Sequence, residues 1–351
     1  MGVTLVHELP FLALFAGLLT TAGLLPLLIR FAPRLKLIAI ANVRSSHVHP
    51  TPTGGGIAIA LPVILWCALS PEPLGFWLAV SGGVLALTGL VDDLIDLAAW
   101  PRFLLQAVSV AGFLYATDTA NGVVALVVIG FLTLWFVNLF NFMDGIDGIA
   151  ATQALLFGLG VLLLSGATLS WIESLVWLVV GSSFAFLLYN WHPAQIFMGD
   201  AGALLLGLCL PAIVLTLDAS GSVPVISSLI LLTVFVFDAT WTLGMRVVTR
   251  QNFTSAHRSH LYQRLATQWG HGRTSLAFGF YTSFWLFPLA WLAITMPAAG
   301  IGCLLAGVAP LVVMAVRFRA GLPDQQGMGK TLATEPGDSS RETHETDDSS
   351  Q

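Results

Sequence analysis

Long apolar stretches separated by short polar connections run along almost the whole chain. A membrane-spanning helix needs about 20 predominantly apolar residues, and runs of this kind recur about eleven times. The runs lie near residues 10–29, 54–70, 75–91, 103–117, 122–141, 149–165, 171–189, 202–217, 223–243, 276–296 and 299–316. The pattern predicts an all-α, polytopic integral membrane protein with about eleven transmembrane helices.

Composition and the placement of charge agree with this prediction. Hydrophobic residues make up 56% of the chain and charged residues 9%, whereas soluble domains carry roughly 25% charged residues. If the N-terminus lies outside the cell, all fourteen Lys and Arg fall on one side of the membrane. Because basic residues are retained on the cytoplasmic side, we expect an outside N-terminus and a cytoplasmic C-terminus.

The end of the chain differs in composition from the rest. Residues 320–351 hold seven acidic and two basic residues, which account for the whole net charge of −5. The segment is also rich in Ser, Thr and Gly, which is typical of disorder. We therefore divide the chain into a membrane-embedded domain, residues 1–319, and a disordered acidic cytoplasmic tail, residues 320–351.

Six aspartates gather on the predicted cytoplasmic side, in three short segments that contain almost no other charge. They are Asp92, Asp93 and Asp96 in VDDLIDL, Asp144 and Asp147 in NFMDGIDG, and Asp200 in FMGDAG. On a helix, carboxylates three or four positions apart share a face and repel each other by roughly a few tenths of a kcal/mol. A divalent cation would offset this repulsion, and Mg²⁺ is held by one or two carboxylates together with water and substrate phosphates. The pattern favours a Mg²⁺ site, with Mn²⁺ as the substitute ion.

Two other interpretations of the aspartates stay open. One is that they cap helices or lie in turns, which suits Asp147 because Gly148 follows it. The other is a multi-pass cation or sugar-phosphate transporter, although transporters place coupling carboxylates near the bilayer midplane. Only Asp238 lies within a predicted span, where an ionisable residue is a functional-site hypothesis by default. A paired residue that packs helices is the alternative for Asp238.

Two segments with basic residues lie on the same predicted side. RSSHVHPTPTGGG contains Arg44, His47 and a run of three glycines, and HRSHLYQRL contains His257, Arg258, His260 and Gln263. The glycines could approach a phosphate or let helices pack closely, and packing is favoured. Arg and His donate charge-assisted hydrogen bonds to phosphate oxygens, although basic loops also arise from membrane topology alone. With a cation site, these segments indicate phosphoryl chemistry between a soluble nucleotide and a lipid phosphate.

Taken together, the segments resemble the polyprenyl-phosphate N-acetylhexosamine-1-phosphate transferases, the superfamily of the MraY, WecA and WbpL enzymes. DDLID is similar to the family's DDxxD motif, NLFNFMDGIDGIA to NxxNxxDGIDGLA, and NWHPAQIFMGDAGALLLG to a segment ending in FMGDxGSxxLG. The two segments with basic residues look most like the WbpL-type branch, which begins O-antigen or related glycan chains. Ala203 stands where the family usually has Ser, and Thr53 where close relatives often have a basic residue. Tyr262 and Gln263 replace the consecutive histidines of the peptidoglycan enzyme, which argues against a MurNAc-pentapeptide substrate.

The resemblance implies a reaction and a set of residue roles. Undecaprenyl phosphate would attack the β-phosphorus of a UDP-N-acetylhexosamine and release UMP, at the cytoplasmic face of the bacterial cytoplasmic (inner) membrane. The implied metal ligands are Asp200 and Asp147. The implied catalytic residues are Asp92, Asp93, Asp96, Asp144, Asp147, His257, Arg258 and His260. The implied substrate-binding residues are Arg44, His47, Asn138, Asn141, Asn190, Gln263 and Asp238. The sugar (GlcNAc, FucNAc or QuiNAc), one-step or two-step transfer, and formation of a homodimer stay open, and no nucleic-acid partner is expected.

Overall fold

The computed structural model describes residues 10–39, 50–117, 122–166, 171–251 and 257–323. Regular structure within these ranges is nearly all helical, so the all-α prediction is confirmed. The helices are α2 (Pro10–Leu35), α3 (Ile57–Ala68), α4 (Pro73–Ile95), α5 (Ala99–Tyr115), α6 (Val123–Met143), α7 (Ile149–Ser165), α8 (Trp171–Asn190), α9 (Gly199–Ala219), α10 (Val225–Leu231), α11 (Thr233–Val248), α12 (Leu261–Trp269), α13 (His271–Tyr281), η1 (Thr282–Leu286), α14 (Phe287–Thr295), η2 (Pro297–Ala299) and α15 (Gly300–Arg317). The strands β1 (Ile38–Ala39) and β2 (Thr51–Pro52) form a short antiparallel ladder.

One to three consecutive helices lie over each predicted apolar run, but these helices differ in length. Within the described residues, seven helical segments are long and apolar enough to cross a membrane, or up to eight if α10 and α11 form one span bent by 75°. The apolar helices α3 and α7 have 12 and 17 residues, and at ~1.5 Å per residue both are shorter than a ~30 Å hydrocarbon core. The polytopic prediction is thus confirmed, whereas the count of eleven spans is not.

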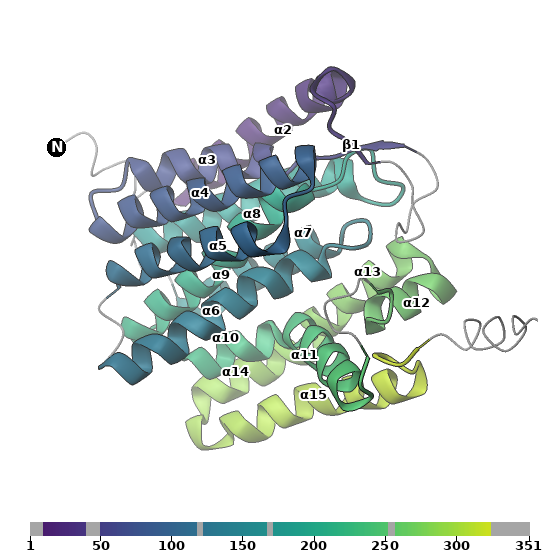
Figure 1. Ribbon diagram of the computed structural model, residues 1–351. Helices are drawn as coiled ribbons and strands as arrows, with labels where there is room; N and C mark the ends of the chain where they lie inside the picture. The colour runs from purple at the N-terminus through teal and green to yellow at the C-terminus, as the bar shows by residue number, and fades with distance from the viewer. Residues whose placement is uncertain (1–9, 40–49, 118–121, 167–170, 252–256, 324–351) are drawn as a thin grey trace, which may run out of the picture.

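Helices α8 and α9 form the centre of the bundle (Figure 1). Each helix contains an apolar stretch of 18 residues, and the buried share of that stretch is 72% in α8 and 78% in α9, against 22% in α2. Small residues let neighbouring backbones touch. A Cβ at Gly181 of α8 would overlap the carbonyl oxygen of Leu14 on α2, and close approach at small residues is typical of helix packing in membranes.

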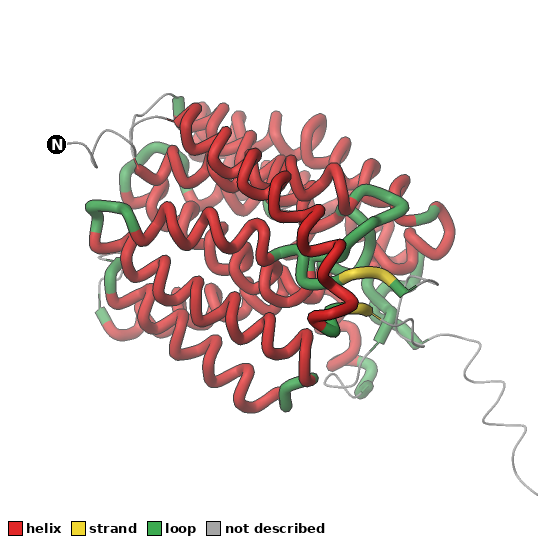
Figure 2. The backbone as a smooth tube through the Cα atoms, turned by 90° about the horizontal axis from the view of Figure 1, so that it is seen from above, coloured by secondary structure: helices red, strands yellow, loops and turns green. Residues whose placement is uncertain are grey.

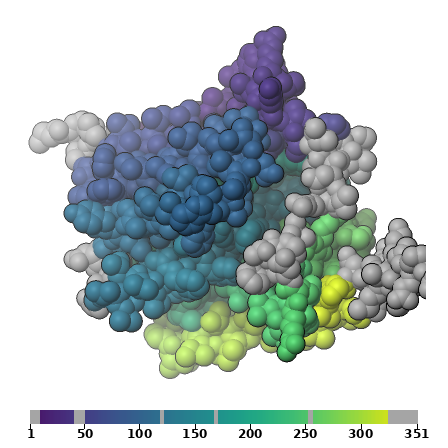
Figure 3. Space-filling view, viewed as in Figure 1, coloured from purple at the N-terminus to yellow at the C-terminus, as the bar shows by residue number. Residues whose placement is uncertain are grey.

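The C-terminal part of α2 projects from the rest of the bundle (Figure 3). Its Leu27 and Phe31 side chains are exposed, at 52% and 39%. The guanidinium carbons of Arg30 and Arg34 lie 5.9 and 5.7 Å from the centroid of the Phe31 ring. Outward apolar side chains next to arginines near a helix end are the arrangement expected where a span leaves the bilayer.

The helix ends that carry the three aspartate segments meet at one end of the bundle. Helices α4 and α6 end there and α7 and α9 begin there, close to β1 (Figures 1 and 2). Antiparallel neighbours joined by short connections produce this gathering of ends. The predicted substrate-binding residues Arg44 and His47, and the predicted tail beyond residue 323, lie outside the described residues.

Candidate active site

A polar cavity of about 330 Å³ opens where these helix ends meet. Its size lies in the range of ~300–1,000 Å³ that small-molecule sites occupy. Its lining residues are Thr53, Asp93, Asn141, Asp144, Gly145, Ile146, Asp147, Asn190, Phe197, Met198, Gly199, Asp200, Gln263 and His271. Four of the six clustered aspartates, from all three segments, therefore share one cavity with the predicted Asn141, Asn190 and Gln263.

Asp93 and Asp200 form the acidic side of the cavity together with Asp92 behind them. The backbone N–H of Asp200 donates to Oδ1 of Asp93 at 3.3 Å, while the buried Oδ2 of Asp93 has no hydrogen-bond partner among the described residues. Arg102 at the start of α5 pairs with Asp92, and its Nη1 lies 3.8 Å from Oδ2 of Asp200. A single guanidinium thus contacts two carboxylates, those of Asp92 and Asp200.

Glycines bring the two helices that carry these carboxylates into contact. A Cβ at Gly89 of α4 would overlap the backbone of Asp200 at the start of α9, and a Cβ at Gly199 would overlap Oδ2 of Asp93. Gly199 also has a φ of +70°, a conformation that side chains with a Cβ rarely adopt. The FMGD turn therefore needs glycine both for its backbone shape and for the space that the Asp93 carboxylate fills.

The donor set of this acidic side fits a magnesium ion. Mg²⁺ prefers carboxylate oxygens, and the unpartnered Oδ2 of Asp93 is a buried acceptor of the kind that requires a cation or donor. Asp144 lies close to the same carboxylates. Burial and the nearby Asp200, Asp93 and Asp147 raise its pKa well above the usual value, and a cation would offset this repulsion. The residues best placed to hold the ion are therefore Asp93 and Asp200.

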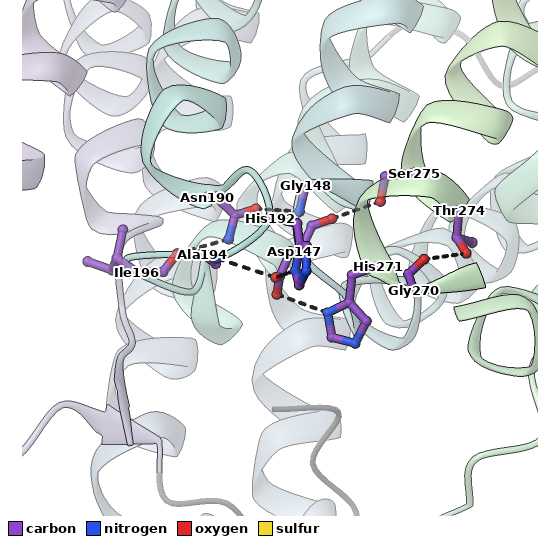
Figure 4. Close-up of polar contacts among 10 residues, drawn as sticks. All are labelled: Asp147, Gly148, Asn190, His192, Ala194, Ile196, Gly270, His271, Thr274 and Ser275. Carbon is purple, nitrogen blue, oxygen red and sulfur yellow. Dashed lines mark hydrogen bonds and ion pairs between the residues drawn. The ribbon is translucent and has the colours of Figure 1, made fainter. Parts of the chain in front are cut away.

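Asp147 faces two histidines (Figure 4). His192 Nδ1 lies 2.6 Å from its Oδ2, His271 Nδ1 lies 3.2 Å from its Oδ1, and the Ala194 N–H donates to Oδ2 at 3.3 Å. Burial alone would raise the pKa of Asp147, but the contacts with His271 and His192 lower it below the usual value. The ligand atoms of these three side chains lie within 4.8 Å of one another. Imidazole nitrogens suit a transition metal better than Mg²⁺, so Asp147 as a magnesium ligand remains a prediction.

Of the two parts of the alternative for Asp147, the structure shows the turn but not the helix cap: Asp147 lies in the turn before α7. The N-cap residue of α7 is Gly148, and that helix start has no side-chain cap. Asn190 holds the turn instead, since its Oδ1 accepts from the Gly148 N–H at 2.9 Å and its Nδ2 donates to the Ile196 carbonyl at 2.8 Å. The predicted Asn190 thus joins the DGIDG turn to the loop between α8 and α9.

Of the predicted residues in HRSHLYQRL, only Gln263 lines the cavity. His257 and His260 stack on each other with ring centroids 5.1 Å apart. Burial, helped by His260 and Arg246, lowers the pKa of His257 to about 4. His257 is therefore neutral at neutral pH, and it lacks the positive charge that we expected for phosphate binding. Arg258 and His260 also lie outside the cavity lining.

Three other predicted site residues lie away from the cavity. Asp96 is exposed and is the C-cap residue of α4, with a φ of +53°. The Asn138 amide donates to the Leu134 carbonyl of its own helix at 2.9 Å. Asp238 is buried beneath the start of α12, where its carboxylate accepts hydrogen bonds from backbone N–H groups.

The glycine run packs helices, as the sequence favoured. The N–H groups of Gly55 and Gly56 donate to the carbonyls of Phe197 and Met198 at 2.9 and 2.8 Å. A Cβ at Gly56 would overlap the backbone of Gly202 on α9. These N–H groups are already bonded within the protein, so they do not cradle a phosphate.

Sequence reasoning missed Arg102, His192 and His271. Arg102 follows Asp92 by ten positions, a separation at which helical periodicity does not reveal a contact. His192 lies two positions after the predicted Asn190 in NWHPA, which is the only local signal for it. His271 follows Gly270 at the start of α13, and nothing near it in the sequence indicates its contact with Asp147.

Comparison with known proteins gives consistent matches. Residues 75–218 match the family described as glycosyl transferase family 4. The chain is 31% identical over 278 residues to the probable undecaprenyl-phosphate N-acetylglucosaminyl 1-phosphate transferase of Bacillus subtilis (strain 168), covering 72% of this chain and 76% of that protein.

Two further relatives align with this chain over most of their own length. The chain is 29% identical over 371 residues to the decaprenyl-phosphate N-acetylglucosaminephosphotransferase of Mycobacterium tuberculosis (strain ATCC 25618 / H37Rv), covering 89% of this chain and 90% of that protein. It is 28% identical over 329 residues to the phospho-N-acetylmuramoyl-pentapeptide-transferase of Geobacillus kaustophilus (strain HTA426), covering 78% of this chain and 98% of that protein.

Proposed function

Because the chain belongs to glycosyl transferase family 4, within the polyprenyl-phosphate N-acetylhexosamine-1-phosphate transferase superfamily, we propose that it moves a sugar 1-phosphate from a UDP-N-acetylhexosamine to undecaprenyl phosphate. The observation that carries the proposal is the convergence of Asp93, Asp144 and Asp200 on one cavity at one end of the bundle. Carboxylates from three distant segments have little reason to meet unless they hold a cation and the phosphates that accompany it.

The proposed cofactor is Mg²⁺, with Mn²⁺ as a substitute, held by Asp93 and Asp200. When bound, the ion would neutralise the diphosphate and align it for displacement. Arg102 keeps the neighbouring Asp92 paired and presents a cation beside Asp200. We place the acceptor phosphate at this edge, because a guanidinium binds phosphate oxygens well.

The reaction needs little activation of the nucleophile. A phosphate monoester with a second pKa of ~6 is already mostly ionised at neutral pH. An oxygen of undecaprenyl phosphate forms a bond to the β-phosphorus, the bond from that phosphorus to the bridging oxygen breaks, and UMP leaves. Asn141, Asn190 and Gln263 line the same cavity, and Asn141 and Gln263 supply neutral donors and acceptors for the nucleotide or the sugar.

The proposed donor is UDP-GlcNAc, with UDP-FucNAc and UDP-QuiNAc as the other candidates. Two of the relatives are N-acetylglucosamine 1-phosphate transferases by name, and Gln263 stands where the peptidoglycan enzyme has histidine. The product would begin an O-antigen, a lipopolysaccharide or a related envelope glycan.

We further propose that the cavity faces the cytoplasm of a bacterial inner membrane, in a chain of about eleven spans with an outside N-terminus. Support comes from Arg34 and Arg317, which lie in the last turns of α2 and α15, at the end of the bundle where β1 lies (Figure 1). A single cysteine at Ser46 should resist an impermeant thiol reagent added to intact cells. Labelling of that cysteine from outside would contradict the orientation.

The rival function is transport of a cation or a sugar phosphate. The position of the carboxylates favours an enzyme, because they lie at helix ends whereas transporters bind near the bilayer midplane. The test is to incubate purified protein with Mg²⁺, undecaprenyl phosphate and each UDP-sugar, then determine the mass of the lipid fraction. A lipid heavier by one N-acetylhexosamine phosphate supports the proposal, and an unchanged lipid with every donor counts against it.

A further inference from the structure

We propose that Asp238 is a positioning residue of the transferase, whose buried carboxylate fixes the start of α12 and thereby the cavity wall formed by Gln263. The inference rests on the proposed function, which supplies the substrates for its test. It differs from the substrate-binding role that the sequence predicted for Asp238, because this residue does not line the cavity.

The Asp238 carboxylate caps a helix to which it does not belong. Asp238 lies on α11 and is 1% exposed. Its Oδ1 accepts from the Leu261 N–H and its Oδ2 from the Tyr262 N–H, each at 2.8 Å. Thr242 Oγ1 donates to Oδ1 at 3.1 Å, and His260 Nδ1 lies 3.3 Å from the same oxygen. Three of these four contacts join the carboxylate to the start of α12, and the fourth, from Thr242, comes from its own helix.

The physical reason is the set of unpaired donors at a helix start. The first N–H groups of any helix have no partner within it, and a negative charge there also interacts favourably with the helix dipole. Here the two oxygens of one carboxylate bond to two consecutive N–H groups. These two directional bonds fix the orientation of α12 relative to α11. An apolar contact would restrict that orientation less.

The fixed helix start leads directly to the cavity. Gln263 follows Tyr262, accepts from the His260 N–H through Oε1 at 3.3 Å, and lines the cavity. The Tyr262 hydroxyl donates to the Phe142 carbonyl at 2.9 Å, close in sequence to the cavity residue Asp144. A Cβ at Gly145 would overlap that hydroxyl. Asp238 thus acts on the donor site through the first turn of α12, where Tyr262 bonds to Phe142 and Gln263 lines the cavity.

The test compares two aspartates with the same chemistry in different places. Asp218 also accepts a bond from the N–H at a helix start, that of Val225 at 2.8 Å, but at the far end of α9 from Asp200. In Asp238→Asn one carboxylate oxygen becomes an amide that cannot accept. We expect kcat/KM for the UDP-sugar to fall by ~10- to 100-fold, the effect of losing a hydrogen bond to a charged group. The KM for undecaprenyl phosphate should stay within about twofold, and Asp218→Asn should match wild type in both.

Two further measurements separate positioning from general stability. Affinity for UMP in the presence of Mg²⁺, measured by calorimetry on folded protein, should fall in Asp238→Asn and not in Asp218→Asn. Gln263→Ala should lower donor kcat/KM, and adding it to Asp238→Asn should cost less than the product of the two single effects, because coupled residues are not additive. If Asp238→Asn does not fold, Tyr262→Phe removes the bond to Phe142 and should weaken UMP in the same direction.

The outcomes distinguish this inference from the proposed function. A wild-type protein that makes no lipid product overturns the transferase proposal, while UMP binding still reports on Asp238. An active wild type with unchanged donor kinetics and UMP affinity in Asp238→Asn overturns the positioning role. If the effects of Asp238→Asn and Gln263→Ala on donor kcat/KM simply multiply in the double variant, the positioning role is also overturned.

Discussion

The backbone N–H of Asp200 donates to the side chain of Asp93 at 3.3 Å, although the two residues are 107 positions apart in the chain. This contact joins the DDLID segment at the end of α4 to the FMGD turn that begins α9. It places two carboxylates side by side while leaving Oδ2 of Asp93 without a partner among the described residues. The pair is the part of the cavity where a divalent cation fits best.

Replacing Asp200 should separate a metal ligand from a turn residue. Loss of groups that only support a metal ligand costs ~10- to 100-fold, so Asp200→Asn and Asp200→Glu should each lower turnover by at least ~100-fold. Asn keeps the shape but removes the charge, and it should raise the Mg²⁺ concentration needed for half-maximal rate more than Glu does. Initial rates against Mg²⁺ concentration give both quantities, with Asp218→Asn as the control. A turn residue would tolerate Asn, so an unchanged rate and metal dependence would remove Asp200 from the site.

His271 offers a test of the contact with Asp147. Asn places an amide near the position of Nδ1, which lies 3.2 Å from Oδ1 of Asp147, whereas Gln places its amide near Nε2. If the contact orients Asp147 within the cavity, His271→Gln should raise the donor KM by ~5- to 10-fold, the effect of losing one polar contact. His271→Asn should raise it less. Steady-state kinetics decide, and the opposite order would show that Nε2, facing away from Asp147, is the important atom.

His257 predicts how stability depends on pH. Its pKa is about 4 in the folded protein, against 6.5 for an ordinary histidine. As the pH falls below about 6.5, the unfolded chain binds a proton that the folded chain does not bind, so this site lowers stability progressively down to about pH 4. The melting temperature in detergent should therefore fall less between pH 6.5 and 4.5 for His257→Gln than for wild type. Parallel curves for the two proteins would contradict the buried, neutral imidazole.

The sequence was sufficient to predict the helices and to bring the aspartates to one side of the membrane. Apolar runs define helices directly, and three charge-poor segments with aspartates on one predicted side indicated a cation site. Four of these aspartates, Asp93, Asp144, Asp147 and Asp200, line one cavity. The lengths of the helices were harder to predict from the sequence. The run near 54–70 is apolar throughout, but α3 covers only Ile57–Ala68, because its first glycines form the turn that packs on α9.

Contacts between distant segments could not be predicted. His192 meets Asp147 across 45 positions, and neither local pattern implies the other. Asp238 was singled out correctly as an unusual ionisable residue in an apolar helix, but its partners are backbone N–H groups of α12. A sequence does not show backbone donors, so it could not distinguish a residue that binds substrate from one that positions a helix.

The most direct measurement follows the β-phosphate of the donor. Purified protein, Mg²⁺, undecaprenyl phosphate and UDP-GlcNAc labelled with ³²P at the β-phosphorus are incubated, and the label is traced between the lipid and nucleotide fractions. Sugar-1-phosphate transfer predicts label in the lipid and release of unlabelled UMP, with both absent in Asp200→Asn. Release of labelled UDP together with an unlabelled glycolipid would mean transfer of the sugar alone, and would contradict sugar-1-phosphate transfer at the Asp93–Asp200 site.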